Sequence, residues 1–166
     1  VAQHLEEELE EEYGIEAVVS TNVHDSPDWY RSYACSRETA EALLAKYPDA
    51  KLIIDLHRDS GPKKQDTTLT VDGEAAAKLL LVVGSDATMD HPNWQQNWAT
   101  AKAVGAAIDT VNPDILRAVR VQKGRYNQHL TKNAILLEVG TDLNTLEEAC
   151  HSVEIFAAAV DEYLDE

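Results

Sequence analysis

Apolar residues that recur every three or four positions predict helices, because this spacing places them on one helix face. In the first such segment, Leu5, Leu9 and Tyr13 form the apolar side. The glutamates within residues 6–12 form the solvated side, and Gly14 is well placed to end the helix. The chain is therefore expected to begin with an acidic amphipathic helix.

Four further helices are predicted from apolar stripes, caps and the places of prolines. Residues 32–47 form one, and residues 90–92 begin a long one, whose proline suits a first turn. Residues 113–119 form a shorter helix. Thr145 and Glu148 make a capping-box pattern at the start of the last helix. The expected buried stripes of the two long helices are Trp94, Trp98, Ala101, Val104, Ile108 and Val111, and Leu146, Cys150, Val153, Ala157, Val160 and Leu164.

Short apolar runs predict the strands, which are residues 15–19, 52–57, 67–71, 78–83 and 134–139. Asp72-Gly73 is a turn signal, although the gap up to Ala77 is longer than a minimal hairpin loop. The main strands are continuous apolar runs that alternate with helices. This pattern is typical of an α/β fold with a mainly parallel sheet covered by helices. No linker or repeat interrupts the chain, so residues 1–166 are expected to form a single domain.

The charge of the chain restricts its partners. Thirty acidic and fourteen basic residues give a formal net charge of −16. Phosphate backbones repel such a surface, so nucleic-acid binding is disfavoured and not expected, whereas metal ions and cationic surfaces are attracted. Cys35 and Cys150 lack metal-site spacing and are expected to be buried thiols, with one disulfide as the alternative.

Glu138 is the most unusual residue, because it interrupts the apolar run of residues 134–139. An ionised carboxylate in such a strand needs a compensating charge or hydrogen bond. One interpretation is that Glu138 is a structural residue paired with Arg58 or Arg125. The other is that it is a catalytic base that faces a water molecule bound to a metal ion.

His57 is the second candidate, because it stands at the end of the buried strand 52–57. Ligands of open α/β sheets bind beyond the carboxyl ends of the strands, where a neutral imidazole can hold a metal ion. The alternative is a hydrogen-bonded structural histidine. Asp55 and Asp59 flank His57 and could orient its second ring nitrogen, although Asp59 could equally cap the following loop. Together with Glu138, His57 suggests metal-assisted hydrolysis.

Four stretches give the chain a resemblance to a known family. They are TNVHDSPDWYRSYACSRET, IIDLHRDS, NWQQNWATA and GRYNQHLTKNAILLEVGTDLNTLEEA. Over nearly its whole length, the chain resembles stage II sporulation protein P, a cell-wall amidase family of endospore-forming bacteria.

The resemblance implies a fold and an activity. The family is similar to the zinc-dependent N-acetylmuramoyl-L-alanine amidases, which hydrolyse the amide between muramic acid and the first alanine of the peptide stem. Cleavage of stem-peptide cross-links is also attributed to this branch. His57 in DLHRDS matches a zinc ligand and Glu138 in LLEVG matches the catalytic glutamate.

Other residues of these motifs are weaker candidates. Arg58, Arg125, Asn127 and Gln128 could contact the substrate, with Arg125 gripping a stem-peptide carboxylate. The alternative is that they tie a loop to the sheet. Two further residues, His24 and Asp25, lie in a family stretch, where loop structure or substrate contact is expected rather than zinc binding.

The chain departs from the family at its N-terminal side. The family pattern begins with a strand that ends in a His-Thr-His motif, followed by a glutamate, and these supply the other zinc ligands. No part of this chain matches them, so the amidase domain is expected to be truncated there and its zinc site incomplete. The family also implies an upstream membrane anchor and an extracytoplasmic location.

Three functions follow from these observations. The leading one is a zinc-dependent peptidoglycan hydrolase that acts during engulfment, in which the glycan-cleaving stage II sporulation protein D and a membrane protein of the same complex are partners. The second is a non-catalytic fragment that binds peptidoglycan or a partner. A phosphate-binding α/β domain is disfavoured, because the chain has no glycine-rich loop.

Overall fold

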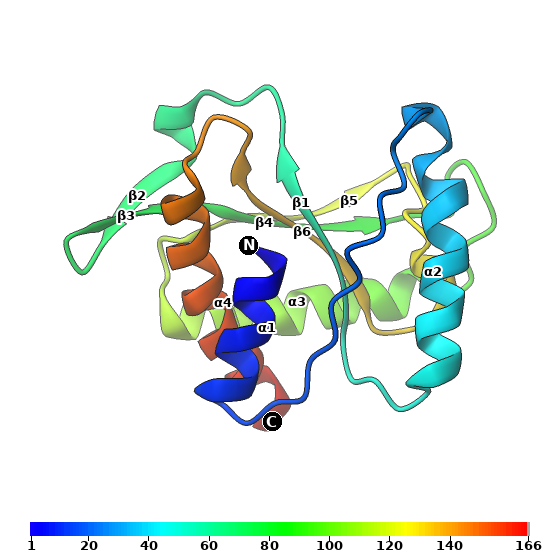
Figure 1. Cartoon of the computed structure of the whole chain (residues 1–166), viewed down its shortest axis with the longest axis horizontal. Helices are drawn as coiled ribbons and strands as arrows, with labels where there is room; N and C mark the ends of the chain where they lie inside the picture. The colour runs from blue at the N-terminus through cyan, green and yellow to red at the C-terminus, as the bar shows by residue number, and fades with distance from the viewer. Residues whose placement is uncertain (166) are drawn as a thin grey trace.

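A four-stranded sheet with the strand order β1-β6-β4-β5 forms the centre of the computed structural model, which describes residues 1–165 (Figure 1). Two of its three strand pairings, β1 with β6 and β4 with β5, are parallel, whereas β4 and β6 are antiparallel. The predicted mainly parallel α/β sheet is therefore confirmed. The strands are β1 (Ile53–Asp59), β4 (Leu79–Gly84), β5 (Leu116–Gln122) and β6 (Ala134–Thr141).

The two faces of this sheet are covered differently. Helices α1 (Ala2–Glu11), α3 (Trp94–Val111) and α4 (Leu146–Asp165) pack on one face and form the main hydrophobic core with alternate strand residues. Helix α2 (Ser32–Lys46) lies apart from these three helices (Figure 1). None of its side chains is fully buried, Leu43 and Leu44 included, and Cys35 is an exposed free thiol rather than a buried one. The second thiol, Cys150, is partly buried and also free.

The opposite face of the sheet carries a smaller apolar cluster of Leu80, Val82 and Leu136. Because side chains alternate between the faces of a strand, residues 55, 57 and 138 project from this face while their neighbours enter the main core. Polar side chains can therefore stand here without disturbing the core.

The predicted strand at residues 15–19 is wrong. The segment is extended but bonds helix α1 instead of another strand. Ile15 N donates to Leu9 O at 2.8 Å, and Val19 N donates to Glu6 Oε1 at 2.9 Å. Its apolar residues Ile15 and Ala17 still pack against the main core, which explains why the segment reads as a strand.

The predicted helix at residues 113–119 is also wrong, because β5 occupies this region and pairs with β4. Ile115 is fully buried, and Leu116 and Val119 pack against the main core. Tertiary pairing with β4 thus overrides the helical reading of a short segment with a proline near its start.

The turn signal at Asp72-Gly73 is confirmed, and the loop is shorter than predicted. It joins β2 (Thr68–Val71) to β3 (Glu74–Ala77) in a two-residue hairpin, with φ of 52° at Asp72 and 92° at Gly73. Positive φ at both loop positions matches the twist of a tight hairpin. The strand β3 lies within a segment that was expected to be loop.

The stripes predicted for α3 and α4 are buried in their central parts and exposed at some of their ends. Ala101, Val104 and Ile108 of α3 are fully buried, whereas Val111 at its end is 39% exposed. The predicted capping box at the start of α4 is confirmed, because Thr145 N donates to Glu148 Oε2 at 2.9 Å and Glu148 N donates to Thr145 Oγ1 at 3.2 Å.

None of the described helices could cross a membrane. Within residues 1–165, each helix is too short or too polar to span a bilayer.

Replacing Ser152 tests how α4 is fastened to β3. Ser152 is fully buried, and its Oγ accepts from Ala77 N at 2.7 Å. The carbonyl oxygens of Ala77 and Glu148 both lie 2.7 Å from this Oγ, and either can accept its one proton. We expect Ser152→Ala to lower the free energy of unfolding in urea by about 1–3 kcal/mol, because buried groups of Ala77 lose their partner. Thr110→Ala is the control, since Thr110 bonds only the Ala106 carbonyl of its own helix and is exposed. Equal losses in both variants would contradict this role of Ser152.

Candidate active site

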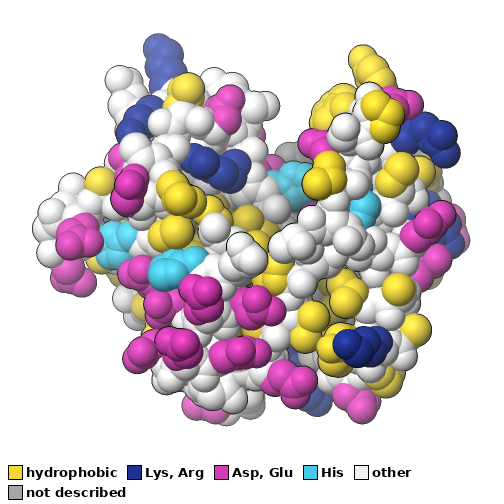
Figure 2. Space-filling model, in the orientation of Figure 1, with side chains coloured by type: hydrophobic (Ala, Val, Ile, Leu, Met, Phe, Trp, Pro, Cys, Tyr) yellow, Lys and Arg dark blue, Asp and Glu magenta, His cyan; other side chains and the backbone are white. Residues whose placement is uncertain are grey.

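His57 and Glu138 stand directly opposite each other on the parallel strands β1 and β6. Adjacent strands lie about 4.8 Å apart, so the two side chains leave the same face of the sheet as neighbours. Both lie near the carboxyl ends of their strands, where ligands of open α/β sheets bind. The predicted pair is thus brought together. In Figure 2, the surface is hollowed between the α2 side and the loops that follow β1 and β6.

Asp55 and Tyr33 hold the imidazole of His57. Asp55 Oδ1 lies 3.0 Å from His57 Nε2, and the Tyr33 hydroxyl donates to Asp55 Oδ2 at 3.1 Å. The rings of Tyr33 and His57 are parallel within 4°, with centroids 6.3 Å apart. The hydrogen bond to Asp55 raises the pKa of His57, with burial opposing this and Glu138 adding to it. Burial and the nearby Asp55 also raise the pKa of Tyr33, so its hydroxyl stays protonated.

Glu138 has no matching partner. Its Oε2 is buried and forms no hydrogen bond, and burial raises the pKa of its carboxyl. His57 and Arg117 oppose this rise, whereas Asp55 and Asp59 add to it. A partly buried carboxylate that accepts few hydrogen bonds has a high affinity for a proton or a cation. This is the property that a general base requires.

The arginines expected to pair with Glu138 bind elsewhere. Arg58 Nη2 donates to the carbonyls of Thr141, at 2.6 Å, and Asn144, which fastens the loop after β6. Arg125 donates to the Asp90 carbonyl at 3.1 Å. Arg117 of β5 is the cation near the site, and it pairs with Asp59 at 3.2 Å. Asp59 therefore binds Arg117 and its own loop at Ser60 N, and no bond joins it to His57.

The residues expected to bind substrate differ in their access to it. Gln128 is 2% exposed, and its amide accepts from Gly84 N at 2.8 Å and donates to Val82 O at 3.1 Å. The amide is therefore buried and bonded within the protein, away from any substrate. Asn127 Nδ2 donates to Tyr33 O at 2.8 Å and thereby joins its loop to α2. The contacts of Gln128 with β4 fit the alternative in which these residues tie the loop to the sheet, whereas Asn127 ties the loop to α2 instead.

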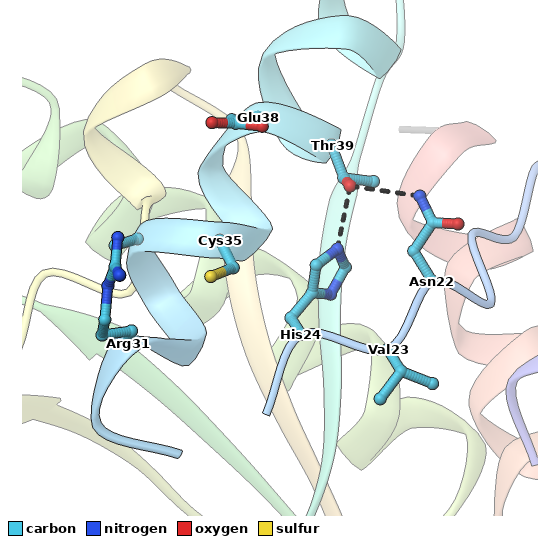
Figure 3. A pocket seen from close by; sticks show the side chains of 8 residues that line it. Asn22, Val23, His24, Arg31, Cys35, Glu38 and Thr39 are labelled. Atoms are coloured by element: carbon cyan, nitrogen blue, oxygen red, sulfur yellow. Dashed lines mark hydrogen bonds between the residues drawn. The ribbon is translucent and has the colours of Figure 1, made fainter. Parts of the chain in front are cut away.

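His24 belongs to a separate shallow pocket of about 410 Å³ between residues 22–24 and α2 (Figure 3). Its Nε2 lies 2.8 Å from Thr39 Oγ1, which also accepts from Asn22 at 3.3 Å. His57 and Glu138 do not line this pocket, and Asp25 is exposed. His24 thus bonds α2 within its own pocket, and its expected part in loop structure or substrate contact stays a prediction.

Two side chains at His57 are of the kinds that bind metal ions. His57 offers an imidazole, and Glu138 offers a buried oxygen without a partner. Among residues 1–165, however, the only group of three side chains close enough to hold a metal ion is His4, Glu8 and Glu154. This group joins α1 to α4, where acidic side chains gather in Figure 2. His57 and Glu138 therefore fall short of the three or four protein ligands that a zinc ion takes, within the part of the chain that the structure describes.

Sequence reasoning missed two residues of this site, Tyr33 and Arg117. Tyr33 lies in a quoted family stretch, but its helix carries no apolar periodicity that would assign it a face. Arg117 lay in the segment that was wrongly predicted to be a helix. The alternation of apolar and polar residues at positions 119–122 was the available signal for a strand.

Replacing Glu138 tests its electrostatic cost to the fold. A raised pKa means that the folded state binds this proton more tightly than the unfolded chain, so stability falls as pH rises above the ordinary value of 4.5. We expect Glu138→Gln to raise the free energy of unfolding at neutral pH, by about 1.4 kcal/mol for each pKa unit. The gain should shrink toward pH values below 4.5. Denaturant unfolding across this range measures it.

Glu11→Gln is the control for that measurement, because it removes the same charge from an exposed position on α1. A Glu138→Gln variant that is no more stable than Glu11→Gln at neutral pH would contradict the burial cost.

Comparisons with known structures agree with this geometry. The N-acetylmuramoyl-L-alanine amidase AmiC2 of Nostoc punctiforme superposes with a TM-score of 0.58 at 17% identity, covering 99% of this chain and 80% of that one. The catalytic domain of CwlV, an N-acetylmuramoyl-L-alanine amidase from Bacillus (Paenibacillus) polymyxa var. colistinus, gives a TM-score of 0.58 at 18% identity, with the same coverage. The chain therefore has the amidase fold, as predicted.

Comparisons of sequence identify the family. The stage II sporulation protein P of Bacillus subtilis (strain 168) is 36% identical over 126 residues, covering 73% of this chain and 30% of that protein. The chain thus spans about a third of the length of this relative. A family model described as stage II sporulation protein P (SpoIIP) matches residues 1–161. These matches confirm the resemblance of the motifs: the chain belongs to the stage II sporulation protein P family.

Proposed function

We propose that this protein is a zinc-dependent peptidoglycan hydrolase of sporulation, which cleaves the amide between N-acetylmuramic acid and L-alanine during engulfment. One observation carries the proposal. In an amidase fold, the partner-free carboxylate of Glu138 stands across from His57 where β1 and β6 end. Family membership supports the biological setting.

Glu138 is the general base and later the general acid. Its free Oε2 accepts a proton from the water that attacks the amide carbonyl. It then delivers this proton to the alanine nitrogen as the C–N bond breaks, so the products are a carboxylate and an amine. The raised pKa of Glu138 suits both steps, because it brings the proton affinity of the carboxylate closer to that needed at neutral pH.

His57 is a zinc ligand in this proposal. When bound, zinc supplies Lewis acidity, which polarises a carbonyl and lowers the pKa of water. Asp55 orients the imidazole through Nε2. The carboxylate of Asp59 is engaged by Arg117, so its part is to place Arg117 near Glu138 rather than to orient His57.

The remaining ligands come from a segment upstream of Val1, in which the family carries its His-Thr-His motif. The sheet offers such a strand an edge at β1. Within the described residues, β1 is an edge strand that pairs only with β6, and residues 15–20 are extended without joining a ladder. A strand added outside β1 would deliver its end beside His57, because neighbouring strands in register place their side chains side by side.

Substrate contacts are proposed for fewer residues than the sequence suggested. Arg125 is partly exposed and donates one hydrogen bond to the Asp90 carbonyl, which leaves donors for a stem-peptide carboxylate. Arg58, Asn127 and Gln128 bind backbone groups of the protein itself. We therefore assign these three to holding the loops of the site.

The location and partners follow from the family. We propose an extracytoplasmic protein held at the membrane by an upstream segment. We further propose that it acts with the stage II sporulation protein D enzyme and a membrane protein of the same complex. The acidic surface suits a basic partner patch.

A second function is favoured by one observation, which is that residues 1–165 bring no group of three metal-ligating side chains together at His57. A chain that keeps the groove but lacks the metal would bind peptidoglycan or a partner without cutting. The two functions differ in whether zinc is held and whether amide bonds are broken.

Zinc content tests the assignment of His57. We expect the natural protein, including its upstream segment, to hold about one zinc ion per chain, and His57→Ala to lose it or bind it at least roughly tenfold more weakly. Elemental analysis after chelation and zinc re-addition measures this, with His151→Ala on α4 as the control. The 166-residue chain alone is expected to retain none. Zinc that persists in His57→Ala would place the site elsewhere, for example at His4.

Peptidoglycan digestion tests the reaction. With intact sacculi and the same natural protein, we expect new amino groups of L-alanine to appear, and Glu138→Gln to reduce their release by roughly 10²- to 10⁴-fold. The inactive variant should still bind sacculi. Glu11→Gln is the control for charge. Undiminished release by Glu138→Gln would refute its catalytic role, and binding without release by the unaltered protein would favour the second function.

A further inference from the structure

Tyr33 connects helix α2 to the Asp55–His57 pair. Its hydroxyl donates to Asp55 Oδ2 at 3.1 Å, while the other carboxylate oxygen of Asp55 lies 3.0 Å from His57 Nε2. The same hydroxyl lies 3.5 Å from His57 Nε2, and its ring is parallel to the imidazole. Both oxygens of Asp55 are thus occupied, one by each neighbour.

These contacts determine the proton position on His57. A neutral imidazole has one nitrogen that donates and one that accepts, and the partner of one nitrogen fixes the state of the other. A carboxylate only accepts, so Asp55 requires the proton on Nε2 and leaves Nδ1 as the free lone pair. A carboxylate that can rotate would enforce this less well than one anchored at its second oxygen.

We propose that Tyr33 is a positioning residue that anchors the Asp55 carboxylate and thereby holds the neutral imidazole of His57 in the tautomer with Nδ1 free. The value of this tautomer for holding a metal ion rests on the proposed function, whereas the hydrogen-bond chain itself does not. Tyr33 touches no reacting atom in this role and acts through Asp55.

The surroundings of Tyr33 fix its own place. Asn127 Nδ2 donates to the Tyr33 carbonyl at 2.8 Å and lies 3.1 Å from Ser36 Oγ, which clamps the first turn of α2. Tyr126 packs its ring edge against Tyr33, with centroids 5.5 Å apart. Tyr126 and Asn127 adopt left-handed backbone angles, with φ of 51° and 54°. This conformation is unfavourable for residues other than glycine and persists only where contacts with the surrounding structure stabilise it. Residues 124–128 (GRYNQ) therefore help to hold Tyr33 in place through Tyr126 and Asn127.

The ¹⁵N shifts of the His57 ring report its tautomer and provide the first test. The 166-residue chain is measured without metal, at a pH well above the His57 pKa. We expect the Nε2–H tautomer to dominate, and Tyr33→Phe to raise the share of the Nδ1–H tautomer several-fold. The control is Tyr126→Phe, whose hydroxyl bonds Gln122 at 3.1 Å and not Asp55. Both variants keep their rings and hence the packing. An unchanged tautomer ratio in Tyr33→Phe overturns the proposal.

A second pair of variants tests whether Tyr33 acts through Asp55. In an Asp55→Asn chain, the carboxylate is absent, and we expect the added Tyr33→Phe change to leave the tautomer ratio unaltered. A shift as large as in the unaltered background would mean that Tyr33 acts on His57 directly, and would overturn the assignment.

Zinc titration of the natural protein, monitored at the His57 ring, links the role to the proposed function. Loss of a supporting hydrogen bond around a ligand weakens metal binding roughly 10- to 100-fold. We expect Tyr33→Phe to weaken zinc binding by up to roughly tenfold and Tyr126→Phe to leave it unchanged. Equal affinities in Tyr33→Phe and the unaltered protein overturn this link. A tautomer shift in a protein that binds no zinc at His57 would instead refute the proposed function and leave the positioning role intact.

Discussion

The parallel register of β1 and β6 is the constraint on which the site depends. It sets His57 opposite Glu138, and the alternation of each strand sends Ile54 and Leu137 into the core on the other face. A slip of one residue would exchange the faces, burying a carboxylate in the core and exposing apolar side chains. The energy of the core therefore also fixes the geometry of the His57–Glu138 pair.

Residues that are chemically out of place could be predicted from the sequence. Glu138 interrupts an apolar strand and His57 ends one, and both lie where they were expected. The fold class and the start of α4 were equally accessible, because continuous strands and a capping box are local patterns. The roles of Glu138 in catalysis and of His57 in zinc binding stay predictions.

Contacts that join distant segments could not be predicted in this way. Arg117 approaches Glu138 only because residues 116–122 form a strand, and they form a strand because they pair with β4. Gln128 reads as a polar surface residue, yet its amide completes the backbone bonding of β4 from within. Tyr33 bonds a residue 22 positions away along the chain. In each case, the partner is determined by topology rather than by local spacing.

The free side of β1 has a consequence for how this chain behaves in solution. A strand with unpaired backbone N–H and C=O groups can serve as a template for another chain, and such pairing leads to domain swapping or aggregation. The later half of β1 carries Asp55, His57, Arg58 and Asp59, whereas its start is Ile53-Ile54. Charge thus protects the half that holds the site. The uncharged Ile53-Ile54 end of the strand lacks this protection.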